Sequence, residues 1–401
     1  MSGRIFITGI GVVSAIGNNV QENYQKLITL QSGIDDIQYL DTIHKGILPA
    51  GEVKLSNQEL AQRLDIKDSR HYTRTTLLGM MAAKEAFENA GISDTKKYRT
   101  GLISASTVGG MDSSENFYKE FISDHSSGDL NKIITHDCGD STEKIADYLG
   151  IKDHISTIST ACSSSANAAI LGARLIKNNI LDRVLIGGTD ALTKFTINGF
   201  NTLMILDPNL CTPFDENRKG LNLGEGAGFI VMESEEVVRK ENKKPLAELT
   251  GYGNANDAFH QTASSPEGYG AFLAMQKALQ ISGLNISDID YINVHGTGTP
   301  NNDSSEGKAL ERLFEGNVPD FSSTKSYTGH TLAACGGIEA VFSILAIQNN
   351  IVFPNLRFKE KIKEHSISPV TELKNKKIRH VLSNSFGFGG NNTSLIFSIA
   401  E

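Results

Sequence analysis

HISTISTACSSSANAAILGARLIKNN, residues 154–179, is the stretch that decides the fold. It opens with a run of Ile, Ser and Thr that predicts a strand, and from Ala166 its small apolar residues recur at helical spacing. Cys162 lies at the turn between the two predicted elements. A second stretch, GHTLAACGGIEAVFSILAI at 329–347, follows the same plan of a polar turn and a small-residue helix. The chain therefore contains a duplicated unit.

Further pairs of segments repeat in the same order, each pair sharing a strand-like run, a Gly-rich turn or a helix that ends at glycine. They are RIFITGIGVVSAIG with PLAELTGYGNANDA, MMAAKEAFENAGI with AFLAMQKALQISGL, GLISASTVGG with YINVHGTGTP, and VLIGGTDAL with VLSNSFGFGG. Alternating strand and helix signals indicate an α/β fold. We predict two halves, 1–240 and 245–401, joined by the charged segment 233–245, with 116–140 inserted as loops or a cap near the site.

Composition limits the function. The 401 residues are 39% hydrophobic and 21% charged, which excludes wholesale disorder, and the net charge of −8 without a long Lys/Arg run disfavours nucleic acid as a partner. None of the four cysteines forms a C-x-x-C pair, so no metal site is expected and a reducing cytoplasm is favoured. No apolar stretch approaches the ~20 residues of a membrane span, so no membrane partner is expected.

Cys162 is the best nucleophile candidate. A thiol at the start of a helix faces unpaired N–H groups and the positive end of the helix dipole, and both favour the thiolate. The alternative is a buried cysteine that acts as a small hydrophobic residue, which is the commoner role. Position alone leaves the two interpretations equally weighted.

Two histidines and a lysine lie in the second half. His295 follows a predicted strand in HGTGTP, and His330 opens the small-residue helix. Two histidines in Gly/Thr turns of the same half favour a catalytic pair over ordinary hydrogen-bonded residues. Lys325 is either a charge stabiliser or a structural ion-pair partner, with Glu339 as a candidate mate.

Two acidic residues and a glycine-rich loop complete the candidates. Asp303 and Glu306 have the spacing of a capping box and are predicted to be structural. The turn in VLSNSFGFGGNNTSLIF has exposed N–H groups and aromatic side chains, which suit an oxyanion-hole donor or a gate, although a tight turn before a last strand is the simpler interpretation.

Together, TACSSS, NVHGTGTP, STKSYTGH and NSFGFGGNN resemble the β-ketoacyl-[acyl-carrier-protein] synthases of the elongating type I/II class. The resemblance covers essentially the whole chain. It implies a thiolase-like fold with two βαβαβαββ halves in five αβαβα layers, in a cytoplasmic homodimer. It also implies decarboxylative Claisen condensation of an acyl thioester with malonyl-acyl carrier protein, in fatty-acid or polyketide/polyene-type biosynthesis. Substrates are carried on phosphopantetheine, and no further cofactor is implied.

The resemblance also implies roles for individual residues. The catalytic residues are Cys162, His295, His330 and Lys325, with Glu339 supporting the lysine. The oxyanion hole and gate are the N–H groups of Cys162 and Phe388, together with Phe386 and Gly387. The substrate-binding residues are Val108, which sets acyl-pocket depth, and His260, Thr262, Thr297 and Thr299 along the pantetheine. Arg70 and Arg74 are candidates for carrier-protein docking.

The chain departs from the family pattern at Ser165, where a small residue such as glycine is usual, and at Thr212, where a basic docking residue is usual. A non-catalytic chain-length-factor-like subunit is the alternative in another class, but it would lack the Cys162 nucleophile. A thiolase would need a second cysteine near NSFGFGGNN, and a Cys-His-Asn synthase would have asparagine in place of His330.

Overall fold

The strands and helices of the computed structural model, which describes residues 3–401, form two repeated units. The first two residues of the predicted half 1–240 lie outside the described range. The strands of the first unit are β1 (Ile5–Ser14), β2 (Thr100–Ala105), β3 (His154–Ile158), β4 (Arg183–Asp190) and β5 (Gly226–Ser234). Those of the second are β6 (Ala247–Asn256), β7 (Tyr291–Asn293), β8 (Asp320–Ser322), β11 (His380–Gly387) and β12 (Asn391–Ser398).

The two units have the same strand order. From the outer edge inward, the first runs β3-β2-β4-β5-β1 and the second β8-β7-β11-β12-β6. In both, the outer three strands are parallel and the fourth is antiparallel to both of its neighbours. The units meet where β1 pairs with β6 through Phe6–Glu248 and Ile7–Ala247, which makes one ten-stranded sheet. The predicted duplication is confirmed.

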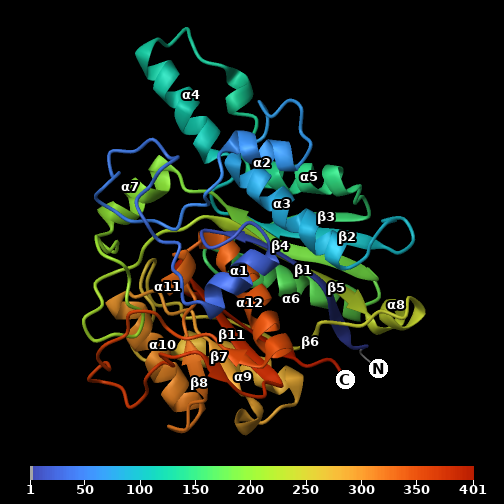
Figure 1. Cartoon of the computed structure of the whole chain (residues 1–401), viewed down its shortest axis with the longest axis vertical. Helices are drawn as coiled ribbons and strands as arrows, with labels where there is room; N and C mark the ends of the chain where they lie inside the picture. The colour runs from blue at the N-terminus through green and yellow to red at the C-terminus, as the bar shows by residue number, and fades with distance from the viewer. Residues whose placement is uncertain (1–2) are drawn as a thin grey trace.

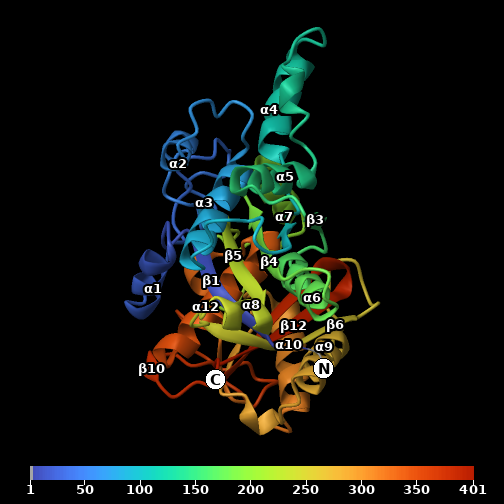
Figure 2. The ribbon, with the colours of Figure 1, turned by 90° about the vertical axis from the view of Figure 1, so that its right-hand side faces the viewer.

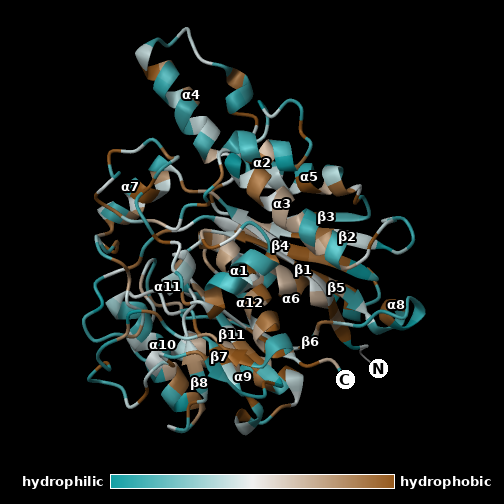
Figure 3. Ribbon diagram, in the orientation of Figure 1, coloured by the Kyte–Doolittle hydropathy of each residue, from teal (hydrophilic) through white to brown (hydrophobic). Residues whose placement is uncertain are grey.

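Each unit contributes three main helices. These are α3 (Arg74–Asn89), α5 (Cys138–Leu149) and α6 (Ser164–Lys177) in the first, and α9 (Tyr269–Ser282), α10 (Pro300–Leu313) and α12 (Cys335–Asn349) in the second. Helices α6 and α12 lie between the two sheet halves, and the other four cover the outer faces (Figures 1 and 2). Because helices cover both faces, strands such as β1 and β4 are buried along their whole length, and most of their residues are apolar or glycine (Figure 3). The predicted five-layered thiolase-like fold is confirmed.

Glycines in β1 and β6 allow close packing of the outer helices. A Cβ added at Gly9 or Gly11 would lie 2.1 Å from a backbone oxygen of α3, and one at Gly251 or Gly253 would lie 2.3 or 2.1 Å from a backbone oxygen of α9. No side chain fits at such distances. The repeated TGIG and TGYG segments are therefore the same strand-helix contact made twice.

The two central helices contact each other closely. A Cβ on Gly336 of α12 would lie 3.0 Å from Ser165 Oγ, and the backbone N–H of Gly337 donates to that oxygen at 2.9 Å. Ser165, the departure from the family pattern, thus bonds the two halves together. The expectation that no apolar stretch approaches the length of a membrane span is wrong, because Leu332–Asn349 is long and apolar enough. It is a core helix, however, since 89% of it is buried inside the protein.

The remaining elements are α1 (Val20–Ile28), α2 (Asn57–Arg63), α4 (Met111–Ser123), α7 (Lys194–Thr202), α8 (Glu235–Lys240), α11 (Lys325–Thr328), β9 (Ile351–Val352), β10 (Lys374–Asn375) and the short 3-10 turns η1 (Leu130–Lys132), η2 (Ile286–Asp288), η3 (Leu332–Ala334) and η4 (Phe388–Gly390). The predicted insertion 116–140 contains most of α4 together with η1, which form an arm that projects from the body (Figure 1). It does not contribute to the cavity described below, so within this chain it is not a cap on the site.

Candidate active site

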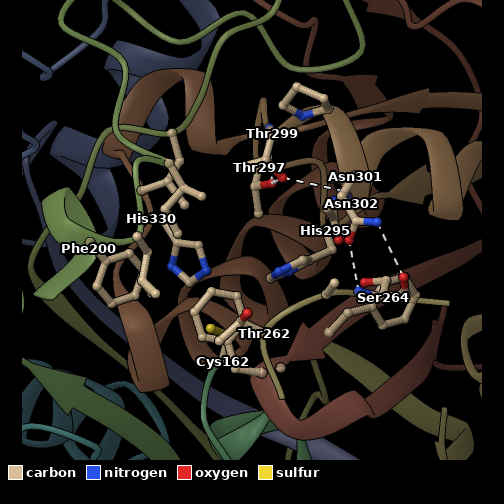
Figure 4. A pocket seen from close by; sticks show the side chains of 18 of the residues that line it. Cys162, Phe200, Thr262, Ser264, His295, Thr297, Thr299, Asn301, Asn302 and His330 are labelled. Carbon is tan, nitrogen blue, oxygen red and sulfur yellow. Dashed lines mark hydrogen bonds between the residues drawn. The ribbon is translucent and has the colours of Figure 1, made fainter. Parts of the chain in front are cut away.

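One cavity of about 330 Å³ brings the two halves together. Cys162 from the first half and His295 and His330 from the second all line it. Figure 4 shows both imidazole rings pointing into the space above the sulfur of Cys162. Several of the other predicted residues also line this cavity, namely Thr262, Thr297, Thr299, Phe386, Gly387 and Phe388.

Cys162 lies on a tight turn between β3 and α6. The preceding residue, Ala161, has φ = +53°, a left-handed conformation that is rare for a residue with a side chain. This turn directs the Cys162 side chain toward the second half, ahead of Ser163, the N-cap of α6. The backbone N–H groups of Phe388 and of Cys162 itself both lower the pKa of the thiol. Both predicted oxyanion donors therefore act on the thiol electrostatically.

The ionisation state of Cys162 differs from the prediction. Burial raises the pKa of the thiol to about 11, against the lowering effects of the Lys325 charge and the two backbone N–H groups. The start of α6 favours a thiolate, but the cost of placing a charge in this apolar environment is larger. The expectation of a preformed thiolate is wrong for the free protein, and the thiol is neutral near pH 7.

His295 and His330 form a perpendicular pair of neutral rings. Their centroids are 5.4 Å apart and the ring planes meet at 88°. Burial, followed by the charge of Lys325, lowers the pKa of His330 to about 3 and that of His295 well below its usual value. The Leu332 N–H donates to Nδ1 of His330 at 3.0 Å, so the proton of the neutral ring is on Nε2.

Two buried carboxylates hold the HGTGTP turn. Glu306 accepts hydrogen bonds from the backbone N–H groups of His295 and Gly296, and Asp303 accepts from those of Thr297 and Gly298. The capping-box prediction is wrong, because Thr299 caps α10 and the two carboxylates bind the preceding turn instead. Their role is structural, as expected, and it fixes the position of His295.

Lys325 and Glu339 form an ion pair buried between the halves. Burial alone would lower the pKa of Lys325, but the Glu339 carboxylate more than offsets this and the pKa lies above its usual value. Lys325 does not line the cavity, yet its charge lowers the pKa of both histidines and opposes the rise in that of Cys162. It therefore acts on the site through its electric field.

The glycine-rich loop closes one side of the cavity. The ring of Phe388 stacks on that of Phe200 in α7 with centroids 5.8 Å apart, and Phe386 lies 5.7 Å from His295. Gly387 packs directly on the nucleophile turn, since an added Cβ would lie 2.8 Å from the backbone oxygen of Thr160.

Two of the predicted substrate residues lie outside the cavity. Val108 is buried in a neighbouring apolar cluster with Leu221 and Leu332, and Leu221 connects this cluster to the cavity wall. His260 is exposed, and its Nδ1 accepts from the Thr262 N–H at 3.2 Å, so it supports the cavity wall from outside.

The docking prediction for Arg74 is wrong. Its side chain is 10% exposed and is bonded to the buried carboxylate of Glu225 and to the backbone oxygens of Val53 and Leu55. A guanidinium held in this way binds within the chain and is not available to a partner. Arg70 is exposed and is paired with Asp68 two residues away, at 2.6 Å.

Several cavity residues were not predicted from the sequence. Phe200 comes from α7, and Ser264 and Asn301 form a hydrogen-bonded pair at the rim, with the Ser264 N–H 2.8 Å from the Asn301 side chain (Figure 4). The Pro-Asn-Asn run after HGTGT was a usable signal, because it continues a singled-out motif. Phe200 had no local signal. Among residues 3–401, no cluster of His, Cys, Asp and Glu is arranged to hold a metal ion.

Family models match both halves. The Beta-ketoacyl synthase, N-terminal domain matches residues 2–237, and the Beta-ketoacyl synthase, C-terminal domain matches residues 246–359. The chain belongs to the β-ketoacyl synthase family. It is 35% identical to 3-oxoacyl-[acyl-carrier-protein] synthase 2 of Staphylococcus aureus (strain N315) over 99% of both chains, and 34% identical to the protein of that name in Coxiella burnetii over 98% of both.

Solved ketosynthases have the same fold. The ishigamide ketosynthase/chain length factor superposes with a TM-score of 0.95 at 28% identity over 100% of both chains. A ketosynthase of Xenorhabdus doucetiae, solved in complex with its chain length factor, gives 0.87 at 31% identity over 99% of this chain and 98% of that one. The predicted family, the thiolase-like fold and the assignment as a condensing enzyme of the ketosynthase class are confirmed.

Proposed function

We propose that this ketosynthase transfers an acyl group to Cys162 and condenses it with a malonyl unit carried on acyl carrier protein, releasing CO2. The observation that carries the proposal is the single cavity lined by Cys162, His295 and His330, with both imidazoles neutral. Neutral imidazoles donate hydrogen bonds without adding a fixed positive charge. No metal, redox cofactor or nucleotide enters the proposed reaction.

The first step is a thioester exchange. The sulfur of Cys162 attacks the acyl carbonyl carbon, and the oxyanion that forms is stabilised by the N–H groups of Cys162 and Phe388. The bond to the carrier sulfur then breaks, and the thiol proton of Cys162 ends on the departing carrier thiol. Because the Cys162 thiol is neutral at rest, it must lose its proton as it attacks.

The second step forms the carbon-carbon bond. Malonyl thioester loses CO2, and the electron pair of the broken bond passes into an enolate. The Nε2–H of His330 and a ring N–H of His295 are the proposed donors to the enolate oxygen. The enolate carbon attacks acyl-Cys162, the β-ketoacyl thioester leaves on its carrier, and the Cys162 thiolate takes up one proton. The Lys325 charge favours the expelled thiolate.

We place the phosphopantetheine of the carrier protein along the cavity wall that the threonines form. Thr262, Thr297 and Thr299 line the cavity and are the proposed pantetheine contacts, with His260 behind Thr262. Val108 is proposed to limit acyl length through the cluster that it forms next to the cavity. Acyl carrier protein is the proposed partner because the relatives of this chain are named 3-oxoacyl-[acyl-carrier-protein] synthases, and Arg70 is the remaining docking candidate.

A homodimer in the cytoplasm is part of the proposal. The support is the open edge of β3, where Ile155 is 42% exposed, and the apolar surface of the arm beside it. The exposed apolar side chains of the arm are Tyr118, Phe121, Ile122, Leu130, Ile133 and Ile134. A second copy would bury this surface. Sedimentation of the unmodified protein and of the Ile155→Glu variant tests the homodimer. The unmodified protein is expected to be a dimer and the variant a monomer. A monomeric unmodified protein contradicts the homodimer.

Intact-mass analysis after incubation with acyl-carrier proteins of several chain lengths tests the function. One acyl group is expected on the unmodified protein and none on Cys162→Ala. The preferred chain separates fatty-acid from polyketide or polyene synthesis. Absence of acylation with every carrier, or acylation that persists in Cys162→Ala, contradicts the proposal.

A further inference from the structure

The side chain of Asn391 connects the Phe388 loop to the helix that follows Cys162. Its Oδ1 lies 2.8 Å from Ser163 Oγ and 2.8 Å from Asn167 Nδ2, both at the start of α6, and 2.9 Å from Asn254 Nδ2 in β6. None of these four side chains lines the cavity. One amide oxygen thus joins an element of the first half to two elements of the second.

Asn391 acts in this cluster as an acceptor. Its three close neighbours approach with an O–H group and two amide N–H groups, and a fourth donor, the Thr393 hydroxyl, lies farther away at 3.5 Å. With the amide reversed, its own NH2 would face two other NH2 groups. Across residues 3–401, Asn391 Nδ2 donates to no acceptor within hydrogen-bonding distance. The chemistry at this position therefore requires an oxygen and not a nitrogen.

The same cluster is hydrogen-bonded to the turn that carries Cys162. The Ser163 hydroxyl is 2.7 Å from the backbone oxygen of Thr160, so its single proton is shared between that oxygen and Asn391. Asn167 donates to Thr160 Oγ1 at 2.9 Å, and its own oxygen accepts from Thr393 and Asn254 at 2.9 and 3.0 Å. The turn on both sides of Cys162 is therefore bonded to the cluster.

The loop itself has little stiffness of its own. Gly389 and Gly390 have φ values of +83° and +79°, and Gly387 precedes Phe388. Glycine leaves a backbone free to adopt many conformations, so the place of the Phe388 N–H depends on the hydrogen bonds that hold the loop. The Gly389 N–H donates to the Gln261 oxygen at 2.7 Å, and Asn256 Nδ2 donates to the Gly389 oxygen at 3.0 Å. Asn391, the first residue of β12, is the end at which side-chain hydrogen bonds reach α6.

We propose that Asn391 is a positioning residue whose side-chain oxygen keeps the Phe388 N–H aligned with the Cys162 thiol. The inference rests on the proposed function, in which that N–H stabilises the oxyanion during acyl transfer. A side chain without an oxygen leaves three donors without their acceptor and releases the loop end. A carboxylate of the same shape keeps all three bonds.

The test compares Asn391→Leu with its matched control Asn391→Asp in the full-length protein. Removing one oxyanion donor costs about 10²–10³ in rate, so a displaced donor is expected to slow Cys162 acylation by ~10–100-fold in the leucine variant. The aspartate variant is expected to restore most of the rate. Acylation is followed by intact mass under single-turnover conditions, and thermal unfolding reports whether each variant is folded.

A second readout does not depend on the acyl substrate. The Phe388 N–H lowers the pKa of Cys162, so its displacement should raise that pKa further. Alkylation by iodoacetamide across pH 7–10 should therefore be slower in Asn391→Leu than in Asn391→Asp. A merely structural role for Asn391 would lower thermal stability without changing this profile.

The outcomes separate this inference from the proposed function. Wild-type rates of acylation and alkylation in Asn391→Leu overturn the inference, as does an aspartate variant that is folded yet as slow as leucine. If the unmodified protein is never acylated, the proposed function fails, and the alkylation profiles still decide whether Asn391 positions the loop. If Asn391→Leu does not fold, Asn254→Ala serves in its place, because it removes one of the donors to the Asn391 oxygen. This variant is expected to show the same change in the alkylation profile, in weaker form. An unchanged profile overturns the inference.

Discussion

The turns before the two central helices are related by the internal repeat, yet only one carries a reactive group. Ala161 before α6 and Leu332 before α12 both have φ = +53°, and each helix begins with a cysteine nearby, Cys162 or Cys335. Burial raises the pKa of both thiols. Cys162 lines the cavity, whereas Cys335 donates its S–H to the backbone oxygen of Cys162 at 3.1 Å. Access and converging N–H groups, and not the start of a helix, distinguish the nucleophile.

In the second half, the turn before α12 contributes different chemistry from the turn before α6. There the turn presents His330, and the strand-turn of HGTGTP presents His295. In the proposed reaction, the duplicated fold divides the chemistry between its halves, with the proposed nucleophile on one and the proposed enolate donors on the other. Lys325 and Glu339 pair in the core of the second half, where the lysine charge reaches the groups contributed by both halves.

The sharpest test of this comparison is to remove each cysteine in turn. Cys162→Ala should lower acyl transfer by at least about 10⁴-fold because the acyl acceptor is gone. Cys335→Ala should acylate at nearly the unmodified rate. Single-turnover intact mass measures both. Equal losses in the two variants would mean that the repeat has not divided the chemistry.

The buried ion pair, made within the second half, tests how much the charges behind the site contribute to stability. Lys325→Met leaves the Glu339 carboxylate buried without its cation and should destabilise the protein by roughly 3–5 kcal/mol. The double variant Lys325→Met, Glu339→Leu should recover much of that loss without recovering condensation. Urea unfolding measures the first effect and product formation the second. A single variant as stable as the unmodified protein contradicts the argument.

The histidines should affect the second step more than the first. His295→Ala and His330→Ala are each expected to lower condensation by about 10²–10³-fold, since each removes a proposed enolate donor. Cys162 should still become acylated in both variants. Pre-acylated enzyme mixed with malonyl carrier separates the steps, and acylation that falls as far as condensation would argue against the division of roles.

The pH dependence compares the two thiols directly. With a pKa of about 11, Cys162 should react with iodoacetamide about tenfold faster per pH unit between pH 7 and 10, because only the thiolate reacts. Cys335, which has no cavity beside it, should stay unmodified in the folded protein. Peptide mapping of the alkylated protein measures each site. A rate for Cys162 that is already flat at pH 7 would indicate a preformed thiolate.

Neutral histidines make a related prediction for stability. The pKa of His330 is lowered to about 3 in the folded state, so below about pH 6.5 the unfolded chain binds a proton that the folded chain does not. Stability should therefore fall as the pH falls through 6.5 toward 4. Urea unfolding of the unmodified protein and of His330→Gln checks the sign, and the glutamine variant should show a shallower fall.

The smallest expected effect is structural. Cys335→Ala removes the S–H bond to the Cys162 backbone oxygen and should cost about 1 kcal/mol in the free energy of unfolding. Urea unfolding of this variant beside Ser343→Ala, whose hydroxyl also bonds to a backbone oxygen within the core, provides the comparison. A loss above several kcal/mol would assign Cys335 a larger role in joining the halves.

The sequence by itself determined the duplicated α/β fold. The repeated TGIG and TGYG segments, and the small-residue helices after Cys162 and His330, are local patterns whose physical cause is close packing, and close packing is visible in the residue types. Part of the candidate site could also be predicted from local sequence patterns. Cys162, His295 and His330 stand in turns at the ends of strands or the starts of helices, where side chains are presented to a cavity.

Only the tertiary structure decided the electrostatics and the outer wall of the site. The start of a helix predicted a thiolate at Cys162, but burial, which depends on residues far away in the chain, raised the pKa instead. Arg74 looked like a surface cation until its contact with Glu225, 151 residues away, became visible. Spacing along a chain reports local structure, whereas desolvation and long-range contacts depend on which surfaces meet when the two halves pack.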